Sequence, residues 1–197
     1  MVDDTDLIHM MDPSGAPQNV NFDEPVSTFD DRYVLSVWTK ITADNITQGA
    51  GTHSGTTGDT SGFVADIAVA HDGNFYHIDE AGADPGFELT VEFVGVTAFN
   101  WVQILASYDG GTGHSVQIAL YNFNTATWDV YNAFATSQAE VATPGEYTLQ
   151  NMSFFLPSDT DYIGTGGDAG DVRVRFRHTS MGNAAHDLDM DVVALYQ

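Results

Sequence analysis

The sequence predicts an all-β protein: an antiparallel β-sandwich of about ten strands, of the jelly-roll type. Short apolar stretches recur at even spacing along the chain, and turns rich in Gly, Asp and Asn separate them. Several stretches alternate apolar and polar residues, which is the period of a strand with one buried face. The acidic residues are 22 Asp and only 6 Glu, and Lys40 is the sole lysine, a balance that disfavours helices.

The strands follow from these patterns in chain order. Those expected in the first two thirds are 33–41, 63–70, 75–79, 87–93, 100–108, 114–123 and 128–131. The turn Asp72-Gly73-Asn74 predicts that 63–70 and 75–79 form a hairpin. Residues 48–62 are expected to be a long loop, and 133–142 could hold one helical turn. Strand 146–156 follows, with a bulge expected near Asn151 because its period breaks there.

The strongest pattern lies in 171–191. Its first half alternates three arginines with apolar residues, and its second half alternates three aspartates with apolar residues. An antiparallel hairpin with Arg173 facing Asp191, Arg175 facing Asp189 and Arg177 facing Asp187 would pair every charge and keep every apolar group on the other face. Because a slip by one residue would oppose charge to apolar groups, the pattern predicts this register.

Charge and composition exclude several classes of function and partner. The formal net charge is −23 over 197 residues, so the surface repels phosphate, and we expect no nucleic-acid partner and no anionic membrane partner. The chain contains no cysteine, which removes disulfides and thiol chemistry. The start of the chain is acidic and lacks the basic and apolar regions of a signal peptide, so we expect no Sec export. No catalytic motif is recognisable, so we expect no enzymatic activity.

The chain is expected to comprise an N-terminal arm, 1–25, and a single β-sandwich domain, 26–197. The arm carries apolar residues, Leu7, Ile8, Met10 and Met11, but shows no sustained strand period. Apolar groups without a place in their own core gain by burial on a partner, so we expect these residues to dock on one. The alternative is that the arm folds back over a sheet edge.

Two groups of residues are candidates for binding. Tyr121, Asn124 and Trp128 place aromatics and an amide at one strand end, which is typical of sugar-binding loops, although Trp128 could instead cap the core. His178 and His186 bracket a loop that contains Asn183. With Asp187 the histidines could bind a transition metal, or they could simply bond the loop backbone. No metal is assigned and no cofactor is expected, although the carboxylate clusters could hold a structural Ca²⁺. These clusters are Asp79, Glu80 and Asp84, and Asp159 with Asp161.

The order of several short motifs over 87–197 resembles jelly-roll domains of tailed-bacteriophage virion proteins, of the capsid decoration, head-fibre and tail-fibre types. These domains are in turn similar to galactose-binding-like carbohydrate-binding modules. The motifs are Phe93-x-Gly95-Val96, Trp101-Val102, Tyr108-Asp109-Gly110, Gly113-His114-Ser115-Val116, Leu120-Tyr121-Asn122, Trp128-Asp129, Val174-Arg175-Phe176 with His178, Gly182-Asn183 and His186-Asp187-Leu188.

The resemblance implies a non-enzymatic structural protein, made in the host cytoplasm and exposed on the virion surface, and a capsid decoration or head-fibre protein is favoured over a part of the tail. Its expected partners are the major capsid protein and further copies of itself on the particle. An acidic protein suits the outside of a capsid better than the DNA-filled interior. The alternative is a carbohydrate-binding adsorption module, of tail-fibre or receptor-binding type, that takes a host-surface glycan. A polysaccharide-degrading enzyme is the third and least favoured interpretation.

Overall fold

The computed structural model describes residues 8–11, 34–53, 64–69, 74–111, 113–134, 149–156 and 160–197. The chain divides into two units, Met1–Lys40 and Ile41–Gln197. In the first unit, β1 (Ile8–Met11) pairs antiparallel with β2 (Val34–Val37), and Ile8 lies opposite Val37.

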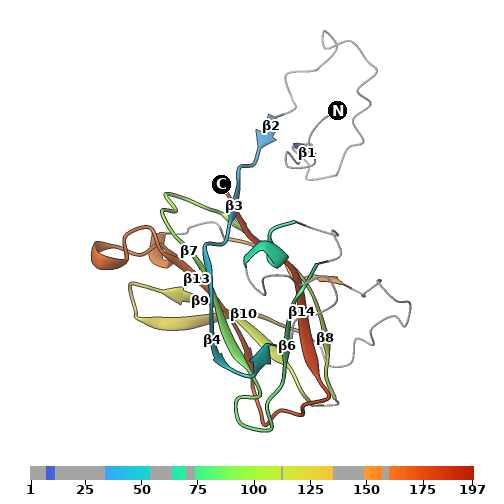
Figure 1. The fold of residues 1–197 in the computed structure, drawn as a ribbon. Helices are drawn as coiled ribbons and strands as arrows, with labels where there is room; N and C mark the ends of the chain where they lie inside the picture. The colour runs from blue at the N-terminus through green and yellow to red at the C-terminus, as the bar shows by residue number, and fades with distance from the viewer. Residues whose placement is uncertain are drawn as a thin grey trace, which may run out of the picture. The chain divides into compact units, whose positions relative to one another are not determined.

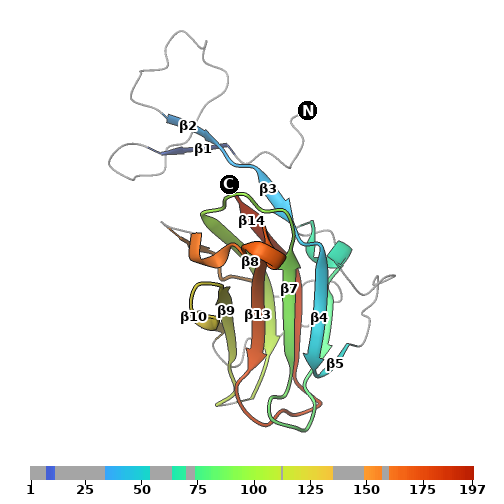
Figure 2. The same ribbon diagram turned by 90° about the vertical axis from the view of Figure 1, so that its left-hand side faces the viewer.

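The second unit is an antiparallel β-sandwich of the jelly-roll type, as predicted (Figure 1). Figure 2 shows the five-stranded sheet side by side in its order: β10 (Thr127–Phe134), β9 (Val116–Asn122), β13 (Val172–His178), β7 (Glu88–Phe93) and β4 (Asn45–Ala50). The seven-stranded sheet has the order β11 (Gln150–Asn151), β8 (Trp101–Asp109), β14 (Asp187–Tyr196), β6 (Tyr76–Asp79) and β5 (Thr52–His53). Two short strands extend it, β12 (Phe154–Phe155) on β8 and β3 (Lys40–Thr42) on β14.

The core lies between the two sheets. Alternating residues of β7 and β13 are buried while their neighbours are half-buried, as their period-two patterns predict. The largest fully buried side chains are Tyr108, Phe87, Phe93, Phe99, Phe176, Ile67, Ile78, Leu89, Ile104, Ile118 and Leu120. Burial of each large apolar side chain contributes about 1.5–3 kcal/mol, so this set of buried side chains supplies much of the driving force for folding.

The predicted hairpin of 171–191 is wrong. Its first half, β13, lies in the five-stranded sheet between β9 and β7, whereas its second half, β14, lies in the seven-stranded sheet between β8 and β6. Arg175 is opposite Thr90 and Ala119, and Asp189 is opposite His77 and Ser107. The two apolar rows are buried in the core as expected, but the two strands belong to different layers of the sandwich.

The arginines and aspartates therefore have other partners. Arg173 donates to Asp168 Oδ1 at 2.7 Å and to Asp171 Oδ2 at 3.0 Å, both in the segment that leads into β13. Arg177 Nε lies 3.0 Å from Glu88 Oε2 on the adjacent β7. Asp189 instead pairs with His77 on β6, with Nδ1 and Oδ1 2.6 Å apart. These charged groups find their partners within their own sheet or in the segment leading into it.

Other expected elements also differ. Within 63–70, which was expected to be a strand, the structure has a 3₁₀ helix, η2 (Val64–Ile67), so the predicted hairpin with 75–79 does not form. A short apolar run of this kind does not distinguish strand from helix by its period. The expected strand 33–41 is divided into β2 and β3, and 146–156 contains β11 and β12 on either side of Met152-Ser153. Strand β4 was not predicted, because its sequence NITQGA has no clear alternation.

Part of the expected arm is a strand. Ile8, Met10 and Met11 lie in β1, although the sequence showed no sustained period there, while Leu7 and most of 1–25 fall outside the described residues. The expected docking of this segment on a partner stays a prediction. Within the described part of the chain, no helix has the length and apolar character needed to cross a membrane.

Candidate functional site

The outer face of the five-stranded sheet carries a group of aromatic and arginine side chains. Tyr121 on β9 lies opposite Trp128 on β10, and Phe123, in the turn that follows β9, packs its ring edge-on against the ring of Tyr121. Arg173 and Arg175 are two of the three outward arginines of the adjacent β13. We call these five residues, Tyr121, Phe123, Trp128, Arg173 and Arg175, the aromatic face.

The rings and guanidinium groups of the aromatic face pack on one another. Tyr121 makes edge-on contacts with Phe123 and with Trp128, with ring centroids 4.9 and 5.2 Å apart. The guanidinium of Arg173 lies 5.6 Å from the centroid of Tyr121 and 5.2 Å from that of Phe123, and Arg175 lies 4.4 Å from that of Trp128. Cation–π contacts of this kind hold both partners in place. The face is therefore ordered before any ligand arrives.

The two arginines differ in how fully they are paired. Burial alone would lower the pKa of Arg173, but its hydrogen bonds to Asp168 and Asp171 outweigh burial and raise the pKa. Arg175 has only Glu88 nearby among the described carboxylates, at 4.0 Å, and burial lowers its pKa. Its Nε is buried and has no hydrogen-bond partner among the described residues. The charged guanidinium of Arg175 thus lies over the Trp128 ring, and its Nε–H has no hydrogen-bond acceptor among the described residues.

Polar side chains continue the same face toward β4. Glu92 on β7 lies between Arg173 on β13 and Asn45 on β4. Asn45 Nδ2 donates to Glu92 Oε2 at 2.8 Å, and Thr47 Oγ1 lies 3.4 Å from the same oxygen. One row of outward residues thus runs across the sheet from aromatic rings to hydrogen-bonding groups. A ligand lying across the strands would meet both.

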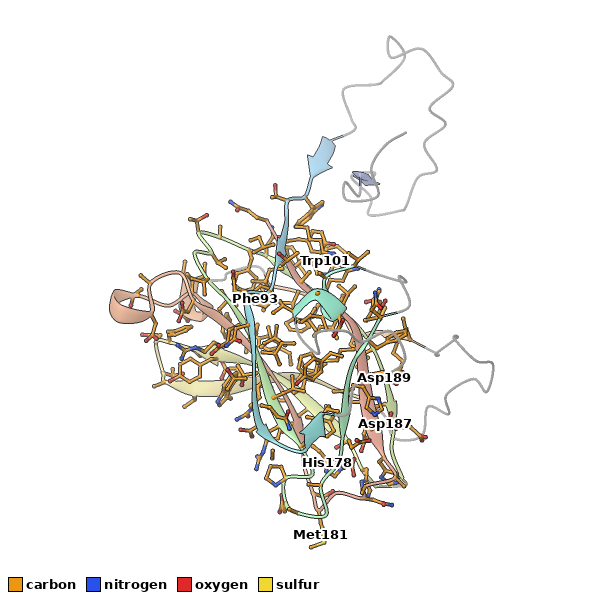
Figure 3. All side chains as sticks on the ribbon, viewed as in Figure 1. Phe93, Trp101, His178, Met181, Asp187 and Asp189 are labelled. Carbon is orange, nitrogen blue, oxygen red and sulfur yellow. The ribbon has the colours of Figure 1, made fainter. Side chains whose placement is uncertain are left out.

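A second group lies at one end of the sandwich, where Figure 3 places His178 close to the loop that carries Met181. Glu80 follows β6, His114 precedes β9, His178 ends β13 and His186 precedes β14. The ring centroid of His114 lies 4.8 Å from that of His178 and 4.8 Å from that of His186. We call Glu80 and these three imidazoles the histidine cluster.

The carboxylate of Glu80 is the centre of the histidine cluster and is fully buried. Tyr108 Oη donates to Glu80 Oε1, and the backbone N–H of Asn183 donates to Oε2 at 2.7 Å. Burial, together with this bond to Glu80, raises the pKa of Tyr108, so its hydroxyl stays protonated. Burial also lowers the pKa of His178 and outweighs the opposing charge of Glu80. The imidazole of His178 is therefore neutral near pH 7.

A third group lies along the paired strands β6 and β14, where His77 is surrounded by carboxylates. Its Nδ1 lies 2.6 Å from Asp189 Oδ1, and its Nε2 lies 3.2 Å from Asp79 Oδ1. Burial by itself would lower the pKa of His77, but the hydrogen bond to Asp189 and the charges of Asp189 and Asp187 raise it to about 9. His77 is therefore an imidazolium at neutral pH.

This pairing makes stability depend on pH. The pKa of His77 is about 9 in the folded chain and 6.5 for an unperturbed histidine, so its stabilising contribution is complete below about pH 6.5. The contribution is lost as the pH rises through about 9, and it amounts to ~3 kcal/mol at most. In urea titrations at pH 6 and pH 10, the wild-type chain should lose more unfolding free energy than His77→Gln. Equal losses in the two proteins would contradict the pairing.

The structure divides the predicted binding residues between two of these groups. Tyr121 and Trp128 belong to the aromatic face, and Asn124 is exposed in the turn beside them, with its backbone N–H bonded to Asn122 Oδ1 at 3.0 Å. His178 and His186 belong to the histidine cluster, and Asn183 supports Glu80 through its backbone. The metal candidate Asp187 lies instead opposite Asp79 and Asp109 on the neighbouring strands.

Sequence reasoning missed several members of both groups. Arg173 and Arg175 were assigned to the hairpin with the aspartates, so their contacts with rings were not expected. His114 and Glu80 are distant in sequence from His178 and only the fold brings them together. The motif Gly113-His114-Ser115-Val116, just before an alternating strand, was the available signal that His114 lies at a strand end.

The carboxylate clusters considered for Ca²⁺ are not gathered as cages within the described residues. Glu80 is buried among imidazole nitrogens, whereas Asp84 is exposed. Asp161 is exposed in η3 (Thr160–Tyr162), and Asp159 lies outside the described residues. Asp79, Asp187 and His77 do form a group whose ligand atoms lie within 4.8 Å of one another. The ion pair between His77 and Asp189, at 2.6 Å, explains why these side chains lie together without a bound ion.

The fold of residues 41–197, as far as the structure describes them, is a jelly-roll β-sandwich. No family model matches the chain, and no curated protein matches it. Among solved structures, the chain is similar to a xylan-binding module, CBM15, with a TM-score of 0.50 and 13% identity over 81% of this chain and 95% of the module. It also matches a family 29 carbohydrate-binding module complexed with cellulohexaose, with a TM-score of 0.49 and 11% identity over 81% of this chain and 89% of that one. At these identities the likeness concerns the fold.

Proposed function

We propose that this chain is a non-enzymatic glycan-binding module that takes a polysaccharide on its aromatic face. The observation that carries the proposal is the position of Trp128 and Tyr121 on an outer sheet face, with arginines stacked on the rings. The solved structures that share this fold include a module whose name states that it binds xylan. Fold does not decide function, so the proposal rests on the site.

The chemistry of the aromatic face suits a sugar. One face of a pyranose ring consists mainly of C–H groups, which pack on aromatic rings, while its hydroxyl groups need hydrogen-bond partners at the edge. The aromatic face supplies rings beside guanidinium donors, and Glu92, Asn45 and Thr47 supply further polar groups along the same row. The packed arginines limit ring motion, which reduces the entropy lost on binding.

The charge of the face favours a neutral or acidic glycan. Three of the chain's five basic residues lie on β13, within a chain whose formal net charge is −23. The nearest described carboxylate to the Arg175 guanidinium is that of Glu88, 4.0 Å from Nη1, so the outer N–H groups of this guanidinium are available to donate to a hydroxyl or a carboxylate of the ligand. A cationic polysaccharide would be attracted by the rest of the acidic surface without needing this face, so its binding would be independent of Trp128.

The test is a screen of plant, fungal and bacterial polysaccharides by affinity electrophoresis, followed by a glycan array. We expect retention by at least one neutral or acidic polysaccharide, with no release of reducing ends on long incubation. Turnover of the bound polysaccharide would contradict the non-enzymatic part of the proposal. Absence of binding across the panel, in a protein that is folded by circular dichroism, would contradict the whole proposal.

The sequence resemblance further implies that this glycan-binding module is part of a virion, either as a decoration or head-fibre protein or as an adsorption module of a tail fibre. The acidic chain and the resemblance of 87–197 to phage virion domains favour it. Under this proposal the partners are other virion proteins and copies of the chain itself, and 1–25 docks on the particle. Mass spectrometry of purified particles with a copy number tests it, because decoration requires hundreds of copies and a fibre far fewer.

A further inference from the structure

The histidine cluster has the donor set of a transition-metal site. Three imidazole nitrogens and one carboxylate converge at the end of the sandwich, and ligand atoms of Glu80, His114 and His178 lie within 4.8 Å of one another. His186 lies beside this group, with Nδ1 3.4 Å from Glu80 Oε2, and the same nitrogen accepts a hydrogen bond from the backbone N–H of Gly111 at 3.4 Å. Nitrogen and oxygen donors in this ratio suit Zn²⁺, while Ca²⁺ and Mg²⁺ prefer oxygen alone.

The separations within the cluster fit a shared ion better than hydrogen bonds. Glu80 Oε1 lies 3.3 Å from His178 Nε2, and Glu80 Oε2 lies 3.4 Å from His114 Nδ1 and 3.4 Å from His186 Nδ1. Hydrogen bonds between nitrogen and oxygen are shorter, at about 2.7–3.2 Å. Zinc bonds of about 2.0–2.1 Å in a tetrahedron place neighbouring ligand atoms roughly 3.3 Å apart. All three contacts of Glu80 have this length.

The cluster also contains an unsatisfied donor atom. His114 Nδ1 is buried and makes no hydrogen bond with the described residues, although it is directed at a carboxylate oxygen 3.4 Å away. Buried polar atoms without a partner are rare, and an ion or water commonly explains them. A metal ion between His114 Nδ1 and Glu80 would satisfy this nitrogen and account for the long separation.

The loops that carry Gly86 and Gly182 pack tightly against the histidine cluster. A Cβ on Gly86 would lie 2.5 Å from His178 Nδ1, and a Cβ on Gly182 would lie 2.8 Å from the Cβ of Glu80, so neither position accepts a side chain. Backbone hydrogen bonds join the two loops, from Gly86 N to Ser180 O at 3.0 Å and from Gly182 N to Ala83 O at 2.9 Å. Tyr108 and the backbone of Asn183 orient the carboxylate, as outer partners of metal ligands do.

We propose that Glu80, His114 and His178 form a Zn²⁺ site. Three protein ligands leave one position of a tetrahedral ion, for water or for the adjacent imidazole of His186. The ligands adjoin β6 of one sheet and β9 and β13 of the other, so the ion would join the two sheets at this end. The proposal is independent of glycan binding, because it uses none of the residues of the aromatic face.

The experiment is a Zn²⁺ titration of the full chain, without a histidine tag, after removal of metal with EDTA. Calorimetry should show one equivalent bound with a dissociation constant at or below the micromolar range. At free Zn²⁺ 100-fold above that constant, the Tm should rise by about 5–10 °C. Co²⁺ in place of Zn²⁺ should give the intense visible absorption of tetrahedral cobalt, a readout that an unoccupied hydrogen-bonded cluster would not produce.

Variants assign the ligands. His114→Ala, at the half-buried rim, should weaken Zn²⁺ binding at least tenfold and abolish the tetrahedral Co²⁺ spectrum, and so should Glu80→Gln if that variant folds. His9→Ala removes an imidazole from β1 and His77→Gln removes the one in the carboxylate group, and both should bind Zn²⁺ as the wild type does. The proposal is overturned if the wild type binds no Zn²⁺, if His114→Ala binds it equally well, or if His77→Gln is the variant that loses it.

Discussion

Trp128→Ala is expected to weaken binding of the glycan found in the screen by 10- to 100-fold, which corresponds to about 1.4–2.7 kcal/mol. The indole is the largest ring of the aromatic face, and its removal deletes the stacking surface and the support of the Arg175 guanidinium together. Calorimetric titration with the soluble oligosaccharide measures the effect. Circular dichroism should show an unchanged fold, since Trp128 is only half-buried.

Two further variants separate stacking from general loss of aromatic surface. Phe155→Ala removes an aromatic ring that is 59% exposed on β12 of the other sheet, and it should leave binding unchanged. Arg175→Lys keeps the charge but loses the planar group that lies over Trp128, so it should weaken binding by a smaller factor than Trp128→Ala. Equal binding by the wild type and Trp128→Ala would refute the role of this ring.

Phe176→Ala is expected to lower the free energy of unfolding by about 3–5 kcal/mol. Phe176 is fully buried on the inward row of β13, beside Leu89 on β7 and Ile118 on β9, so truncation leaves a cavity between the two sheets. Urea denaturation of the wild type and the variant measures the difference. The loss would be a large part of the total stability of a domain of this size.

The same substitution at an exposed position is the control for Phe176→Ala. Phe155→Ala makes the identical chemical change where the ring is 59% exposed, and it should cost less than about 1 kcal/mol. Comparable losses at the two positions would mean that β13 does not face the core as the structure places it.

The faces of β13 and β14 could be predicted from the sequence, but their partners could not. Alternation tells which residues of a strand are buried, and Val174, Phe176 and Leu188 are buried as the pattern indicated. A hairpin and two strands in opposite layers of a sandwich bury the same apolar rows, so the period alone does not distinguish them. Charge pairing suggested the hairpin, yet Glu88 and His77 on other strands are the groups that pair with these rows.

Local sequence pattern was equally limited in predicting the aromatic face and the histidine cluster. Tyr121 and Trp128 could be grouped because a short turn joins their strands, and adjacent strands joined in this way pair. The arginines over these rings come from β13, which is remote in sequence and enters the sheet between β9 and β7. Glu80 and His114 likewise join His178 only through the fold. Local pattern therefore predicted two of the five residues of the aromatic face and two of the four residues of the histidine cluster, and long-range strand order determined the rest.

The most direct test of the central claim is a backbone amide NMR titration of the full chain with the oligosaccharide identified in the screen. If the aromatic face is the glycan site, the shifted amides should lie on β9, β10 and β13 and include those of Tyr121, Trp128 and Arg175, while amides around His178 and His186 stay unchanged. Shifts confined to the histidine end of the sandwich, or to the seven-stranded sheet, would contradict the assignment of glycan binding to this face.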